Sequence, residues 1–180
     1  MNLPAPNLPA PRRPGRYGIA VVCLGNICRS PMAHVVLEAR VDDAGLAGRV
    51  RVESAGTGDW HVGDPMDGRA AATLRAADLD PSLHRAQQVD PAWFAELDLV
   101  LAMDAANLRD LRALAGTHGG AEEARLRLYR DFDPLGRGDV PDPYYGGSDG
   151  FEEVLTMVER TSIALVAALA ELLAEEPDRR

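Results

Sequence analysis

The sequence predicts a single α/β domain built on a mostly parallel sheet. Short apolar runs rich in β-branched residues alternate along the chain with segments of helical periodicity. The chain has 180 residues, which suits one domain. No internal repeat and no second shift in composition divides residues 17–180. We therefore expect one domain over residues 17–180, with ligands bound at the carboxyl ends of the strands.

The first sixteen residues differ in composition from the rest. Residues 1–16 contain five prolines, three arginines and no acidic residue. Proline fixes one backbone angle and lacks the N–H group, so this stretch cannot propagate a helix or a sheet. We expect a disordered, Pro/Arg-rich tail at residues 1–16.

Four apolar runs are typical of strands. They are Tyr17–Cys23, Val50–Ser54, Leu97–Ala102 and Leu126–Tyr129. The first and third are rich in β-formers, as expected of parallel strands that are buried on both faces.

Three segments between these runs have helical patterns, namely Pro31–Asp43, Asp67–Ala77 and Asp104–Leu114. A longer helix follows near the C-terminus, where apolar residues recur every three or four positions and form one stripe for packing on the sheet. The stripe consists of Val154, Val158, Ser162, Leu165, Leu169 and Leu172.

Charge excludes several classes of function. The formal net charge is -9, and all 19 cationic side chains are arginines. Without lysine the chain has neither a Walker A phosphate loop nor a Schiff-base lysine. An acidic chain repels polyanions, so we expect no nucleic-acid partner and no membrane partner.

The cysteines and histidines do not suggest a metal site. Two cysteines, Cys23 and Cys28, are too few for a disulfide framework or a four-cysteine zinc site. The histidines are scattered, without metal-ligand spacing. They are His34, His61, His84 and His118. We expect no metal and no cofactor.

The sequence carries no pattern of a secretory signal peptide at its start. The longest apolar stretch, Ile163–Ala174, is interrupted by Glu171 and is shorter than the roughly 20 residues that a bilayer requires. We expect a cytoplasmic protein whose two thiols stay reduced.

The turn after the first strand concentrates the residues that carry chemistry. Residues 23–31 read CLGNICRSP. Ser30 is a reasonable N-cap, and Pro31 suits the first helical position. Gly25 and Asn26 are the residues best able to adopt left-handed conformations. Because such a loop directs backbone N–H groups into one concavity at a helix N-terminus, we interpret it as an anion nest. The nest comprises Leu24, Gly25, Asn26, Ile27, Cys28, Arg29 and Ser30.

Cys23 lies at the floor of this nest. Backbone amides, the helix N-terminus and Arg29 favour a thiolate, so we expect Cys23 to be ionised at neutral pH and nucleophilic. Arg29 would hold two oxygens of a tetrahedral oxyanion, and the Ser30 hydroxyl would donate to the sulfur. Attack on a bound phosphate would form a thiophosphate ester. The alternative is a buried strand-end cysteine beside an ordinary surface arginine.

The segment VVCLGNICRSPMA resembles the signature loop of the low-molecular-weight protein tyrosine phosphatases. The resemblance extends over most of residues 17–173 through SAGTGDWHVG at 54–63, HRAQQ at 84–88, AMDAANLRDL at 102–111 and DPYYGGSDGFEEV at 142–154. It implies a three-layer sandwich with a four-stranded parallel sheet flanked by helices, the phosphotyrosine phosphatase I-like fold. It also implies metal-free hydrolysis of phosphotyrosine in proteins, with inorganic phosphate or vanadate as competing ligands, by a protein that we expect to be a monomer.

The resemblance also suggests roles for residues outside the loop. Asp142 matches the general acid of the family, and Pro143 restricts it to an extended conformation. Trp60, Tyr144 and Tyr145 match aromatic positions at the entrance, where a substrate ring would stack. A turn at residues 142–147 without catalytic function is the alternative.

Polar residues match positions that hold the loop in its strained shape. These are Asn26, Ser54 and His84, although a purely structural histidine remains an alternative for His84. Asp104 is interpreted either as a helix N-cap or as an active-site carboxylate. In the family, the thiol equivalent to Cys28 forms a reversible disulfide with the nucleophile.

Other functions remain open at this stage. Arsenate reductases share the loop, but the thioredoxin-linked members use two further cysteines that this chain lacks. Phosphoarginine phosphatases typically carry a small polar residue where this chain has Ile27. A non-catalytic module that binds phosphotyrosine or another oxyanion is the third possibility. His34 departs from the family, in which relatives usually carry Glu.

Overall fold

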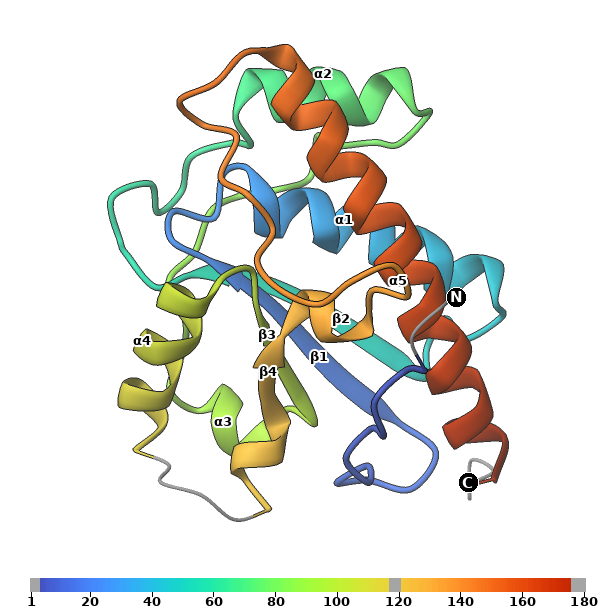
Figure 1. The fold of residues 1–180 in the computed structure, drawn as a ribbon. Helices are drawn as coiled ribbons and strands as arrows, with labels where there is room; N and C mark the ends of the chain where they lie inside the picture. The colour runs from blue at the N-terminus through green and yellow to red at the C-terminus, as the bar shows by residue number, and fades with distance from the viewer. Residues whose placement is uncertain (1–3, 117–120, 176–180) are drawn as a thin grey trace.

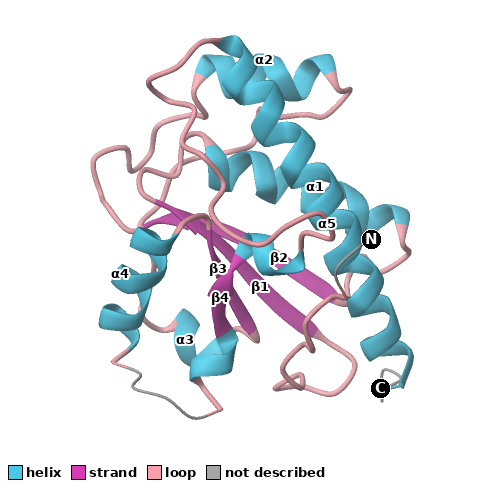
Figure 2. Ribbon diagram, in the orientation of Figure 1, coloured by secondary structure: helices cyan, strands magenta, loops and turns pink. Residues whose placement is uncertain are grey.

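A four-stranded parallel sheet forms the centre of the computed structural model, which describes residues 4–116 and 121–175 (Figure 1). The strand order is β2-β1-β3-β4. The strands are β1 (Tyr17–Cys23), β2 (Val50–Gly56), β3 (Leu99–Ala102) and β4 (Leu126–Leu128). Helices cover both faces of the sheet (Figure 2), so the predicted three-layer α/β sandwich is confirmed.

The helices divide between the two faces. On one face lie α1 (Arg29–Asp43), α2 (Gly68–Ala76) and α5 (Ser148–Glu175). On the other lie the single turn α3 (Trp93–Glu96) and α4 (Ala105–Ala115). Two short 3-10 helices, η1 (Glu123–Arg125) and η2 (Tyr129–Phe132), flank β4.

Strand β1 is buried on both faces. Ile19 and Val21 belong to the hydrophobic cluster under α1 and α5, whereas Ala20 and Val22 belong to the cluster under α3 and α4. Successive side chains of a strand point to opposite faces, so a strand covered on both sides must be apolar throughout. This explains the continuous apolar run in the sequence.

The predicted stripe of α5 faces the core. Its first five members are buried, and Leu172 is half-buried. Ser162, the polar member, lies with its Oγ 2.6 Å from the Tyr129 hydroxyl, which also bonds the Val158 carbonyl oxygen at 3.0 Å. The stripe therefore accommodates a serine because the buried hydroxyls satisfy one another.

Several element boundaries differ from the predictions. Helix α1 begins at Arg29, with Cys28 rather than Ser30 as its N-cap. Pro31 is still tolerated because the first four N–H groups of a helix have no intrahelical partner. Strand β2 extends to Gly56, and β3 begins at Leu99. Helix α3 was not predicted, because four residues are too few to show a helical period.

The structure differs from the expected disorder over residues 4–16. The Arg12 backbone N–H donates to Asp98 at 2.6 Å, and its guanidinium donates to the Leu97 and Phe94 carbonyl oxygens at 2.9 and 3.0 Å. The same guanidinium pairs with Glu122 at 2.6 Å. Composition indicated that this segment lacks helix and strand, but arginine donors attach it to the amino-end side of the sheet (Figure 1).

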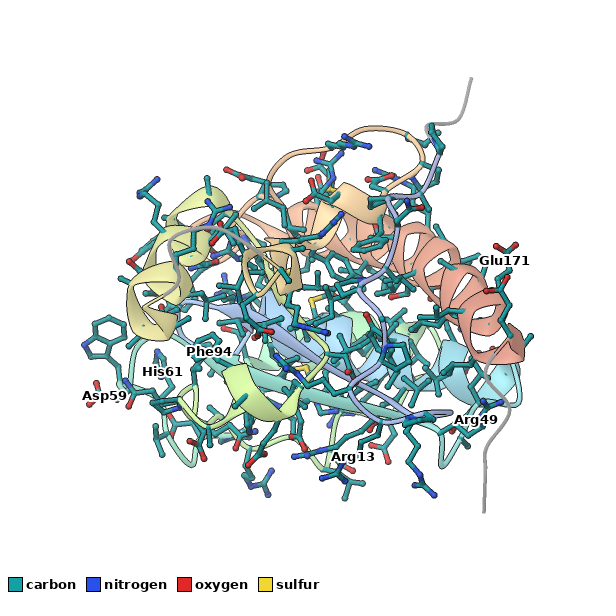
Figure 3. All side chains as sticks on the ribbon, turned by 90° about the horizontal axis from the view of Figure 1, so that it is seen from below. Arg13, Arg49, Asp59, His61, Phe94 and Glu171 are labelled. Carbon is teal, nitrogen blue, oxygen red and sulfur yellow. The ribbon has the colours of Figure 1, made fainter. Side chains whose placement is uncertain are left out.

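The loops at the carboxyl ends of the strands converge at the other end of the sheet. In Figure 1 the loop after β1, the loop after β2 and the orange loop before α5 come together at the upper left. Figure 3 places Asp59 and His61, from the loop after β2, at the opposite end of the molecule from Arg49 and Glu171. Across the described residues, we find no helix that combines the length and the apolar character needed to span a membrane.

Candidate active site

The loop after β1 curls around the sulfur of Cys23. Asn26 has a φ of 56°, which confirms its predicted left-handed conformation. Gly25 has no positive φ, so that part of the prediction is wrong. The left-handed turn brings the Asn26 backbone N–H to 3.3 Å from Cys23 Sγ, to which it donates. Cys23 is the last residue of β1, as predicted, and it is buried.

The Asn26 side chain fastens this turn to its surroundings. Its Oδ1 accepts from the Gln87 backbone N–H at 3.0 Å. Its Nδ2 donates to Ser30 Oγ at 2.9 Å and to Ser54 Oγ at 3.1 Å. His84 Nε2 lies 2.8 Å from the Asn26 carbonyl oxygen. The polar residues that the resemblance suggested therefore meet at Asn26, Ser54 at its carboxamide and His84 at its backbone carbonyl oxygen.

Ser30 does not cap α1, because its hydroxyl bonds to groups in the site. Its Oγ lies 3.0 Å from Cys23 Sγ and 3.3 Å from the Ala55 carbonyl oxygen. A hydroxyl at this place can donate to the sulfur, which stabilises the sulfur as a thiolate.

Arg29 is buried, with 3% of its surface exposed, and its guanidinium is fixed on one side. NH1 donates to Asp104 Oδ2 at 2.7 Å and to the Val140 carbonyl oxygen at 3.0 Å. Asp104 Oδ1 accepts from the Asn107 backbone N–H at 2.7 Å, which caps α4. Asp104 therefore fills both of its predicted roles: it caps a helix and it contacts the site through Arg29.

Asp142 reaches the same guanidinium from the loop before α5. Its Oδ2 lies 3.6 Å from Arg29 NH2, and its Oδ1 accepts from the Tyr144 backbone N–H at 3.1 Å. The loop is held to α2 by Arg69, whose guanidinium donates to the Tyr144 carbonyl oxygen at 3.0 Å. Asp67 in turn pairs with Arg69 at 3.1 Å. Arg69 could not be predicted from the sequence, because nothing local to residue 69 indicates a contact 75 residues away.

These residues surround a cleft of about 300 Å³, which is enough for a small ligand. Trp60 and Tyr145 are 69% and 92% exposed at its rim, and Tyr144 is 39% exposed. Gly58 makes room for Trp60, since a Cβ at Gly58 would lie 1.9 Å from the indole ring. The sequence analysis missed His61, although it lies in the SAGTGDWHVG segment. The lining consists of Cys23, Leu24, Gly25, Ile27, Cys28, Arg29, Trp60, His61, Asp142, Tyr144 and Tyr145.

Cys28 differs from Cys23 in its surroundings. Both thiols are free and buried. Burial and, to a lesser extent, the nearby Asp67 carboxylate raise the pKa of Cys28 to about 12. Cys28 is therefore a neutral thiol at physiological pH. Its predicted disulfide with Cys23 stays a prediction.

Burial of His84 makes the stability of the fold depend on pH. Burial lowers the pKa of His84 below 6.5, the ordinary value for histidine. Between the lowered pKa of His84 in the folded protein and its ordinary value, the unfolded chain binds the His84 proton more readily than the folded one. Acidification below about pH 6.5 therefore favours unfolding. We expect the free energy of unfolding in urea to fall from pH 7.5 to 5.5, and to fall less in His84→Gln. An equal fall in both proteins would contradict this assignment.

No group of three or more His, Cys, Asp or Glu side chains within residues 4–116 and 121–175 could hold a metal ion. His118 lies outside these described residues. The site is therefore built from a thiol, an arginine and a carboxylate at the carboxyl ends of parallel strands. A cysteine and an arginine separated by five residues, enclosed by a strand-to-helix loop in an α/β sandwich, define the class of cysteine-dependent phosphatases.

Comparison with known proteins identifies the family within this class to which the chain belongs. The model of the family described as low molecular weight phosphotyrosine protein phosphatase matches residues 18–175. A low molecular weight protein-tyrosine-phosphatase of Streptomyces coelicolor is 54% identical over 159 residues, which cover 86% of this chain and 94% of that protein. The chain belongs to the low molecular weight phosphotyrosine protein phosphatase family. It is a protein tyrosine phosphatase, a hydrolase, as the sequence predicted.

Solved structures agree with this membership. YfkJ of Bacillus subtilis superimposes with a TM-score of 0.80 at 33% identity, covering 87% of this chain and 96% of that one. Wzb of Vibrio vulnificus, in complex with benzylphosphonate, gives a TM-score of 0.72 at 26% identity, covering 84% and 97%. The predicted four-stranded fold and the predicted family are both confirmed.

Proposed function

We propose that Cys23 is the nucleophile and Asp142 the general acid and base of this phosphatase. The Cys23 thiolate attacks the phosphorus of a phosphotyrosine, and the bond from phosphorus to the phenolic oxygen breaks. Asp142 gives its proton to the departing oxygen, which leaves as tyrosine. Water then attacks the phosphocysteine, Asp142 takes a proton from that water, and the thiolate is released together with inorganic phosphate.

The loop amides and Arg29 hold the phosphate in both steps. Successive N–H groups of residues 24–30 belong to the loop before α1 and to its first turn, and such a nest stabilises three equatorial oxygens as charge redistributes. Asp104 and the Val140 carbonyl fix NH1 of Arg29, while NH2 lies on the side of Asp142. An arginine already held in place loses little entropy when it binds an oxyanion.

The cleft supports phosphotyrosine in proteins as the substrate. The single observation that carries this proposal is that Cys23, Arg29 and Asp142 line one cleft whose rim is aromatic and exposed. A substrate phenyl ring can stack against Trp60 or Tyr145. Wzb of Vibrio vulnificus, a structural relative, is described with benzylphosphonate, in which an aromatic ring carries a phosphonate.

Competing substrates test this proposal. We expect kcat/KM for a phosphotyrosine peptide to exceed that for the matched phosphoarginine peptide, with inorganic phosphate and vanadate as competitive inhibitors and no effect of a metal chelator. We expect Trp60→Ala to raise KM for the phosphotyrosine peptide about fivefold, because ring stacking contributes roughly 1 kcal/mol. A preference for phosphoarginine, or arsenate reduction with thioredoxin, would contradict the proposed substrate.

We further propose a cytoplasmic, monomeric enzyme without cofactor, nucleic-acid partner or membrane partner. A nucleophilic thiol is maintained in a reducing compartment, which supports the cytoplasm. The net charge of -9 supports the exclusion of polyanions. The tyrosine-phosphorylated protein that serves as substrate would be identified by trapping with Asp142→Ala in lysate.

A further inference from the structure

A hydrogen-bonded chain connects the surface of α1 to the nucleophile. At its outer end, His34 Nε2 lies 3.3 Å from Glu38 Oε1 on the next turn of the helix. The other ring nitrogen, Nδ1, lies 3.0 Å from Ser54 Oγ on β2. Ser54 Oγ accepts from Asn26 Nδ2 at 3.1 Å. The His34 imidazole therefore connects the surface of α1 to the catalytic loop through Ser54.

The same Asn26 carboxamide continues the chain inward. Its Nδ2 also donates to Ser30 Oγ at 2.9 Å, and Ser30 Oγ lies 3.0 Å from Cys23 Sγ. Asn26 and Ser30 have no exposed surface, and Ser54 has 2%. Buried hydroxyls at such positions must find their partners among the neighbouring protein groups.

The protonation state of the His34 ring sets the direction of the outer bond in this chain. The two N–H groups of the Asn26 carboxamide serve Ser30 and Ser54. The Ser54 hydroxyl proton is therefore free to donate to His34 Nδ1, provided that Nδ1 carries no proton. The proton of the neutral ring then sits on Nε2 and faces Glu38, while the Ser30 hydroxyl proton can donate to the Cys23 thiolate.

We propose that neutral His34, protonated on Nε2 alone, is a positioning residue that orients the catalytic loop through Ser54 and Asn26. It does not touch the substrate. When His34 takes a second proton, Nδ1–H becomes a donor toward Ser54 Oγ, which then receives two N–H donors and leaves its own proton without this acceptor. The bond from Asn26 to Ser54 weakens, and the left-handed turn that presents the backbone N–H to Cys23 Sγ loses support.

Ionisable side chains lie near the His34 ring and near the catalytic loop. The Glu38 carboxylate lies beside Nε2, and the hydrogen bond from His34 lowers the pKa of that carboxylate. Burial, together with the nearby His34 and Arg85 side chains, lowers the pKa of His84, whose Nε2 lies 2.8 Å from the Asn26 carbonyl oxygen.

The inference rests on the proposed role of Cys23, but its first test does not need turnover. Nitrogen-15 NMR of the unliganded protein reports which ring nitrogen carries the proton. We expect the neutral form of His34 to be protonated on Nε2. The ring signals of His34 are assigned by their loss in the His34→Asn variant. A neutral ring protonated on Nδ1 would overturn the inference whatever the enzyme hydrolyses.

The second test measures the reactivity of Cys23 by two rates, each as a function of pH. These are kcat/KM for an aryl phosphate and alkylation of Cys23 by iodoacetate, measured in a Cys28→Ser background. We expect His34→Leu to lower kcat/KM at pH 8 about tenfold, equivalent to roughly 1.4 kcal/mol. We expect His34→Asn to restore the rate to within about threefold, because its carboxamide oxygen can accept from Ser54.

The pH profile separates positioning from simple structural support. On acidification, both rates should fall more steeply in the wild type than in His34→Asn, which has no ring nitrogen to protonate. Asp42→Asn, an exposed position on the same helix, should retain the wild-type profile. The inference is overturned if His34→Asn keeps the full wild-type pH dependence, and this comparison remains available even if His34→Leu fails to fold.

Discussion

Replacement of Cys23 by serine is expected to abolish hydrolysis of aryl phosphates, with a loss in kcat of at least about 10⁴-fold. The sulfur attacks as a thiolate, whereas a serine hydroxyl is not ionised at neutral pH by the same surroundings. The phosphate nest consists mainly of backbone N–H groups, so the variant should still bind phosphate. Single-turnover hydrolysis of p-nitrophenyl phosphate and calorimetric titration with phosphate measure the two properties separately.

Cys28→Ser is the matched control for this experiment. It makes the same change of sulfur to oxygen in a buried thiol of the same loop. The Cys28 pKa, raised to about 12, keeps that thiol neutral, so Cys28→Ser should retain most of the activity under reducing conditions. Full activity of Cys23→Ser, or turnover that requires an added metal ion, would contradict the assignment of Cys23 as nucleophile.

The catalytic loop could be predicted because its chemistry is local in sequence. Cys23 and Arg29 are separated by only five residues, and the apolar strand before them and the helix after them are both visible as patterns. The predicted strand Tyr17–Cys23 matches β1 at both ends, which placed the thiol at the carboxyl end of the sheet. A strand-to-helix turn of this kind brings its residues together without help from distant segments.

The parts that could not be predicted depend on contacts between distant segments. Asp104 lies 75 residues from Arg29, and only the parallel pairing of β1 with β3 brings the two side chains to 2.7 Å. Gln87 donates its backbone N–H to Asn26 from 61 residues away. The sequence left the role of Asp104 open between helix N-cap and active-site carboxylate, and nothing local to Gln87 indicates its role. A family resemblance indicates that such a residue matters without saying what it touches.

The packing of the N-terminal segment also depends on contacts with distant residues that the sequence does not reveal. Proline content correctly excluded helix and strand, but it does not determine whether a segment packs. Asp98, with 4% of its surface exposed, accepts from the backbone N–H groups of Arg12 and Gly18 at 2.6 and 2.7 Å. A buried carboxylate needs such donors, and composition does not show where they come from.

Asp142→Asn is expected to lower kcat for phenyl phosphate by about 10² to 10⁴-fold, the usual contribution of a general acid. The carboxamide oxygen can still accept from the Tyr144 backbone N–H, which Asp142 holds at 3.1 Å, so the loop should keep its shape. The carboxamide of the variant cannot give the departing oxygen the proton that Asp142 donates. The loss should therefore shrink for p-nitrophenyl phosphate, whose phenolate leaves without protonation.

Comparison of the two substrates distinguishes proton transfer from an electrostatic effect on Arg29. Asp142 Oδ2 lies 3.6 Å from Arg29 NH2, and removing its charge alters phosphate binding equally for both substrates. Asp149→Asn, which removes a charge from an exposed residue in the first turn of α5, is the control and should leave both rates unchanged. If Asp142→Asn slowed both substrates by the same factor, Asp142 would act on phosphate binding and another group would protonate the leaving oxygen.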